Sequence, residues 1–150
     1  MSGVVSYDLL NSKLANGMSG FTSDGGYYET FVNNTGTSVQ GTIVVASTSV
    51  YNGVDIAPAN AEFPIGVIYE TGITNGGNVK VVVSGKALVL LKNTVASTLG
   101  YWCGVSDTAG RMYQSATVPS TIEHNREIGH SLQSEVGGTN VLSLVQIHFN

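Results

Sequence analysis

The densest group of residues able to do chemistry lies between Glu123 and His130, where two carboxylates, two imidazoles and one guanidinium occur within eight residues. A zinc-protease helix spaces two histidines four apart with a glutamate beside the first, so that all three face one metal ion. Here His124 and His130 are six apart. On a strand, that spacing puts them on one face but about 20 Å apart, at roughly 3.3 Å per residue. A metal or hydrolase site at His124, Glu127 and His130 therefore requires a bend in the chain, and the competing interpretation is a solvated loop and strand edge.

The remaining sequence offers no recognised catalytic or cofactor pattern. Glycine-rich runs are frequent, with 19 glycines, but none is followed by the Lys-Ser or Lys-Thr that a phosphate-binding loop needs. No serine sits in a Gly-x-Ser-x-Gly elbow. Cys103 is the single cysteine, which excludes an intrachain disulfide, and its apolar neighbours indicate a small buried side chain. We therefore predict that the chain is not an enzyme and has no catalytic, cofactor-binding or metal-binding residue, with His148 a surface or interface histidine.

The composition is that of one domain with an unusually uncharged surface. Charged residues make up 11% of the 150 residues, where about 25% is typical. The net charge of −4 comes without a basic patch, which argues against nucleic-acid binding, and no apolar stretch is long enough to span a membrane. We also expect no secretion signal, and so a chain made in the cytoplasm. Either much of the surface faces protein, since interface cores are depleted in charge, or it is a polar, uncharged β surface.

The first 26 residues differ from the rest and are predicted to form an N-terminal arm. Ser6 can cap a short helix in which Tyr7, Leu10 and Leu14 share one face, and Gly17 can end it. Such a helix is marginal alone and must pack on the body of the chain or on a neighbour. Its apolar face makes these three residues candidates for a partner interface.

Residues 27–150 are predicted to form one β domain, because short β-branched runs alternate with glycine turns. We expect an all-β fold: a small barrel, a tulip-like barrel or a sandwich. One pattern occurs twice, as Ile65-Gly66 before Gly76-Gly77 and as Ile128-Gly129 before Gly137-Gly138. Each copy predicts a β-hairpin. Ser84-Gly85-Lys86 is interpreted as a turn, and Val79–Val83 and Val141–Val145 as paired core strands; along the last strand, the core face holds Val141, Ser143, Val145, Ile147 and Phe149.

Two adjacent aromatic pairs, Tyr27-Tyr28 and Tyr101-Trp102, are further candidates for recognition. Neighbouring residues of a strand face opposite ways, so we expect one residue of each pair in the core and one at an interface. Tyr27, Tyr28 and Trp102 are the predicted interface candidates. An exposed platform of these rings would favour an alternative function, the binding of glycans.

Several runs of the body resemble the head decoration, or capsid cement, proteins of tailed phages. The runs are Phe63 to Ile68, Val79 to Val89, Gly100 to Gly110, and Ile128-Gly129 before the closing strand Val141 to Phe149. They are similar to that family's Ile-Gly-Val strand, Val-x-Val-x-x-x-Gly hairpin, Gly-led turn and second Ile-Gly. The similarity extends over roughly residues 38 to 149. The N-terminal region, with its predicted helix, lies outside the pattern.

The resemblance implies a β-barrel or tulip-like body that assembles as a homotrimer on the outside of the phage head. It implies contact with the major capsid protein where several capsomers meet, and hence a virion location after synthesis in the host cytoplasm. It implies no catalytic residue and no cofactor. The leading expectation is therefore a structural protein that stabilises the capsid. The alternative is a phage fibre or head-surface module that binds host glycans through the aromatic pairs.

Overall fold

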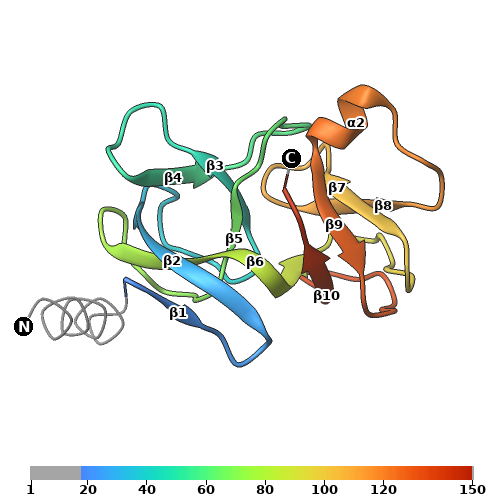
Figure 1. Cartoon of the computed structure of the whole chain (residues 1–150), viewed down its shortest axis with the longest axis horizontal. Helices are drawn as coiled ribbons and strands as arrows, with labels where there is room; N and C mark the ends of the chain where they lie inside the picture. The colour runs from blue at the N-terminus through green and yellow to red at the C-terminus, as the bar shows by residue number, and fades with distance from the viewer. Residues whose placement is uncertain (1–17, 150) are drawn as a thin grey trace, which may run out of the picture.

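The computed structural model describes residues 18–149, and these fold almost entirely into β-strands (Figure 1). Ten strands and one five-residue helix are present in this range, which confirms the predicted all-β class. The predicted arm helix, with Tyr7, Leu10 and Leu14, lies outside the described residues. None of the described helices is long and apolar enough to cross a membrane. The elements are β1 (Ser19–Phe21), β2 (Gly26–Asn33), β3 (Ile43–Ala46), β4 (Gly53–Ile56), β5 (Gly66–Ile68), β6 (Asn78–Leu90), β7 (Trp102–Val105), β8 (Met112–Ser115), α2 (Thr121–Asn125), β9 (Glu127–Ser131) and β10 (Leu142–Ile147).

The first half of the molecule is a closed ring of five strands, here called the N-terminal ring. Its strands follow the order β2-β4-β3-β5-β6, and a direct pairing of β2 with β6 closes the ring. All of its pairings are antiparallel except that of β2 with β4, which is parallel. Closure leaves none of these five strands as a free sheet edge within the ring.

The second half repeats this arrangement and is called the C-terminal ring. It continues from the end of β6 in the order β6-β10-β9-β7-β8. A parallel bridge between Leu91 and Met112, next to the end of β6, links that strand to β8 and closes the ring. Figure 1 shows β1 to β5 in one half of the molecule and β7 to β10 in the other, with β6 between them.

The β6 strand corrects the predicted turn at Ser84-Gly85-Lys86. The strand runs unbroken from Asn78 to Leu90, pairing with β2 up to Gly85 and with β10 from Gly85 onward. Gly85 has a φ of +81°, and a Cβ there would lie 2.6 Å from the carbonyl oxygen of Gly25. The glycine therefore allows a close approach of two backbones rather than a reversal of the chain.

The twice-occurring sequence pattern does form two antiparallel hairpins, β5–β6 and β9–β10. The correspondence between the two rings extends beyond these hairpins, since the hairpin β3–β4 of the N-terminal ring corresponds to β7–β8 of the C-terminal ring. The two hairpins do not pair through Val79–Val83 and Val141–Val145 as predicted; β10 pairs instead with Gly85–Leu90 of β6. The repeat is thus a duplicated five-strand arrangement with β6 common to both copies.

The core consists of two clusters of buried apolar side chains on opposite faces of the N-terminal ring strands. Val67 of β5 belongs to the larger cluster, which extends across both rings, and its neighbour Ile68 belongs to the smaller one. The predicted faces of the last strand are confirmed, because Ser143, Val145 and Ile147 are buried while Gln146 is exposed. The larger cluster therefore joins the two rings through side chains as well as through β6.

At the N-terminal end of the described residues, β1 pairs with β2 in a hairpin. Thr22 and Gly26 close the connecting turn with hydrogen bonds in both main chain and side chain. Residues 18–26 of the predicted arm therefore lie on the body of their own chain. Among residues 18–149, β1 is a terminal strand of the sheet order, so one of its sides is an edge within that range. The division of the chain into an arm and a body at residue 26 stays a prediction.

Candidate metal centre

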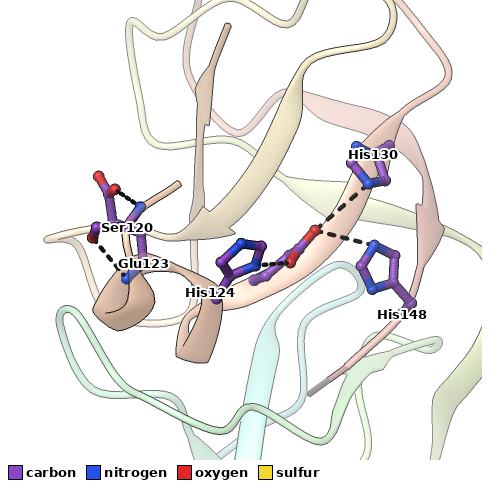
Figure 2. A network of polar contacts seen from close by, with 6 residues as sticks. Ser120, Glu123, His124, His130 and His148 are labelled. Atoms are coloured by element: carbon purple, nitrogen blue, oxygen red, sulfur yellow. Dashed lines mark hydrogen bonds and ion pairs between the residues drawn. The ribbon is translucent and has the colours of Figure 1, made fainter. Parts of the chain in front are cut away.

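The buried carboxylate of Glu127, the first residue of β9, lies at the centre of a cluster that includes all three histidines of the sequence. Its side chain is 4% exposed. His124 Nδ1 is 3.0 Å from Oε2, while His148 Nε2 and His130 Nε2 are 3.1 and 3.5 Å from Oε1. Each histidine side chain is about half exposed, so the cluster connects a buried anion to solvent. Figure 2 shows the three rings converging from different parts of the chain.

His124 reaches the cluster because the chain turns between the two histidines that the sequence placed on one strand. Ser120 caps α2 by accepting a hydrogen bond from the Glu123 amide, and the Glu123 carboxylate accepts one from the Ser120 amide. The hydrogen bond from the Ser120 backbone amide, and after it the Ser120 side chain, hold the pKa of the Glu123 carboxyl below its usual range. The helix ends at Asn125, and β9 begins at Glu127. The chain thus has the bend that a site at these residues requires, and the separation of about 20 Å expected for a single strand does not apply.

Glu127 and His130 share a face because of an irregularity in β9. Residues three apart on a regular strand point in opposite directions. Here Gly129 pairs with Cys103 and Glu127 with Gly104, so Ile128 is an extra residue that shifts the register. Gly129 has a φ of +144°, and a Cβ on it would lie 1.9 Å from the Gln146 carbonyl oxygen. The glycine of the second Ile-Gly therefore permits the bulge that aims the two side chains together.

His148 was missed as a member of this cluster. It was predicted to be a surface or interface histidine, it lies on the face of the last strand opposite the core face, and its side chain is half exposed. That face turns out to be the one next to His130: Gln146 of β10 is the direct neighbour of His130, and His148 lies two residues further on. The two imidazole rings are 5.1 Å apart between centroids. Their spacing along the sequence gives no sign of this, since it depends on the pairing of β9 with β10.

The cluster forms part of the wall of a hollow of about 740 Å³. The other lining residues are mainly apolar, and those on the rim are exposed: Leu99, Tyr101 and Val118. Trp102 lies deeper, 5% exposed, and packs edge-on against Tyr113. Its Nε1 has no hydrogen-bond partner among the described residues. The hollow thus combines an apolar rim with a charged and imidazole-rich part.

The N-terminal ring provides an internal comparison for this site. His130 pairs with Trp102 and Gln146 just as Val67 pairs with Ile43 and Val82. By the same offsets, the counterparts of the three residues around Oε1, namely Glu127, His130 and His148, are Pro64, Val67 and Ser84. The same backbone arrangement therefore forms without a carboxylate or an imidazole at any of the three positions. The cluster is an addition to the fold and is not required to build it.

The predicted interface aromatics lie in different settings. Tyr27 and Tyr28 of β2 are both partly buried; Tyr27 contacts Phe21 edge-on, and Lys80 Nζ lies 5.2 Å from the centre of the Tyr28 ring. In the second pair, Tyr101 is the exposed member and Trp102 the buried one. Trp102 therefore does not supply the exposed platform that glycan stacking needs. The interface roles of Tyr27 and Tyr28 stay predictions.

Cys103 is fully buried, as expected, and should be chemically inert in the native protein. Burial raises the pKa of its thiol to about 12, with a smaller opposing effect from the Gln114 amide, which donates to Sγ at 3.4 Å. Because the thiolate is the reactive species, a disulfide reagent near pH 8 should leave the native thiol unmodified and label it once the protein is unfolded in guanidinium. Rapid labelling of the native protein at one thiol per chain would contradict this prediction.

Comparison with known proteins adds no relative to this description. No protein-family model matches the chain, and no curated protein matches it. The class that fold and site define is an all-β protein with a duplicated ring and a carboxylate–imidazole cluster in one copy.

Proposed function

We propose that the chain is a structural protein that decorates a phage capsid, docking onto the major capsid protein through the hollow of the C-terminal ring and acting as a homotrimer. The family resemblance of residues 38 to 149 supports the capsid, and the all-β body agrees with what that family implies. The low content of charged residues, 11%, suits a surface that meets protein.

The observation that carries the docking surface is again the correspondence between the rings. In the N-terminal ring, the row Ile43, Val67 and Val82 is buried in the core cluster shared with the C-terminal ring. In the equivalent row of the C-terminal ring, Trp102 and His130 line the hollow, where His130 and the rim are open to solvent. One copy of this surface already packs against a β body inside the molecule. We infer that the other copy packs against a second protein.

The edge of the sheet at β1 offers a second contact. The side of β1 that pairs with no other described strand can accept another strand, and main-chain hydrogen bonds then give affinity without particular side chains. Residues 1–17 precede this edge in the chain. A trimer with a threefold axis would present this contact three times. Once one copy is bound, the effective concentration of the other two is high, so three modest contacts together give tight binding.

The docking surface is tested by placing a charge on its rim. Val118, 89% exposed, lines the hollow, and Val136 has nearly the same exposure, 86%, away from it. Val118→Lys is expected to weaken co-sedimentation with heads assembled without this protein by tenfold or more, because the charge is desolvated on docking. Val136→Lys should bind as the unaltered protein does.

Light scattering and electron microscopy complete the test. The unaltered protein should be a trimer, in solution or on the heads, and should appear as added density on their outer surface. Removal of residues 1–17, which leaves β1 intact, should weaken head binding. A protein that stays monomeric and never sediments with heads would contradict the proposal.

A further inference from the structure

We propose that Glu127, His130 and His148 bind one divalent transition-metal ion of the zinc class, with the remaining coordination position open toward the hollow. The inference concerns the isolated chain and does not rest on the proposed function.

The donor atoms are already close to the spacing that such an ion requires. Four-coordinate zinc has metal–ligand distances of about 2.0 to 2.1 Å, which puts neighbouring donor atoms about 3.3 Å apart. The Glu127 Oε1 lies 3.1 Å from His148 Nε2 and 3.5 Å from His130 Nε2. All three atoms lie within 4.8 Å of one another. Small side-chain rotations of the two half-exposed imidazoles are enough to complete the geometry.

The donor set selects the class of metal. Two imidazole nitrogens and one carboxylate oxygen suit zinc, copper, nickel or iron, whereas calcium and magnesium prefer oxygen ligands. His130 and His148 both present Nε2 to the same carboxylate oxygen. In zinc sites with one carboxylate and two histidines as protein ligands, the fourth coordination position is occupied by an exchangeable water molecule or a substrate.

His124 completes the site as a positioning residue. Its Nδ1 contacts Oε2, the carboxylate oxygen that faces away from the two proposed imidazole ligands. This contact fixes the plane of the carboxylate and leaves Oε1 as the single metal-binding oxygen. Residues that hydrogen-bond to a metal ligand commonly orient it in this way. The capped helix α2 in turn holds His124.

The difference between the two rings indicates that Glu127, His130 and His148 are present to bind a ligand. A buried carboxylate is costly to desolvate, and the N-terminal ring builds the same strands with Pro64, Val67 and Ser84 at the three positions. The arrangement of the strands therefore does not require these three side chains. A cation bound between them compensates the buried charge.

The test uses full-length, tag-free protein treated with a chelator and then dialysed. Calorimetric titration with Zn²⁺ is expected to show one ion per chain, and Co²⁺ is expected to give the strong visible absorption of a four-coordinate centre. His130→Ala and His148→Ala should abolish that absorption. The melting temperature of each variant, measured without metal, separates loss of a metal ligand from loss of the fold.

His124→Ala is the matched control, since it also removes one histidine from the cluster. It should keep the one-to-one stoichiometry and the four-coordinate cobalt spectrum, with an affinity weaker by about 10- to 100-fold. The proposal is overturned if the unaltered protein binds no Zn²⁺, or if His130→Ala and His148→Ala retain the cobalt spectrum. Head binding is not measured in this experiment, so its outcome leaves the docking proposal to its own test.

Discussion

Replacing Gly129 with alanine is expected to lower the free energy of unfolding by about 3 kcal/mol or more. The added Cβ would lie 1.9 Å from the Gln146 carbonyl oxygen and 3.0 Å from the Ile147 Cα, both on the paired strand β10. Backbone atoms cannot move aside as the end of a flexible side chain can. The variant must therefore separate β9 from β10 or lose the bulge at Ile128. Urea denaturation followed by circular dichroism measures the change.

Gly76→Ala is the matched control for this prediction. Gly76 also has a positive φ, +87°, but a Cβ there would meet nothing within 4 Å. The control isolates the conformational cost of a left-handed residue, roughly 1 to 2 kcal/mol. Equal losses for the two variants would show that the contact with β10 is unimportant. A smaller loss at Gly76 would assign the difference to the crowding between strands.

The second large effect is expected for Asn33→Asp, which exchanges one nitrogen for oxygen at the end of β2. Asn33 is fully buried, and its amide nitrogen faces three carbonyl oxygens, those of Gly36, Ile73 and Thr74. Its Oδ1 accepts hydrogen bonds from the backbone and hydroxyl of Thr35. An aspartate would place a charged acceptor against three acceptors. We expect the free energy of unfolding at neutral pH to fall by about 3 kcal/mol or more.

The pH dependence gives this prediction a distinctive sign. The neighbouring carbonyl oxygens raise the pKa of the introduced carboxyl above its value in the unfolded chain. The folded variant then binds more protons than the unfolded one, so its stability relative to the unaltered protein falls as pH rises and recovers in acid. Asn75→Asp is the control, because the exposed Asn75 uses its oxygen to accept from the Gly36 amide. If the loss in free energy of unfolding caused by Asn33→Asp does not change with pH, the explanation by a raised carboxyl pKa is wrong.

The sequence predicted those parts of the fold that depend on local pattern. The β class and the two hairpins follow from alternation and turn residues, and the burial along the last strand follows its alternation. The repeated Ile-Gly proved informative for a physical reason. A Cβ at Gly66 would lie 2.3 Å from the Val81 side chain, and one at Gly129 would strike β10. Both glycines are positions where a neighbouring strand comes too close for any side chain.

The parts that could not be predicted depend on contacts between distant segments. The pairing of β2 with β6 and the bridge from Leu91 to Met112 close the two rings, and neither has a local signature. The site was missed in part for the same reason, since His148 joins it only through the pairing of β9 with β10. The bend before Glu127 did have a signal: Ser120 followed three residues later by Glu123 is a capping box.

The shared strand β6 has a consequence for how the protein folds and melts. Each ring closes on its own part of this one 13-residue strand, so the two rings are joined by a continuous strand and by the larger core cluster. Melting one ring would expose the part of the larger core cluster that it shares with the other, so heating is expected to give a single cooperative transition. Because closure joins segments far apart in the sequence, folding should be slow for a chain of this length, in the range of milliseconds to seconds or longer. Unfolding crosses the same barrier, so the folded chain should also unfold slowly and should therefore resist proteases for a long time.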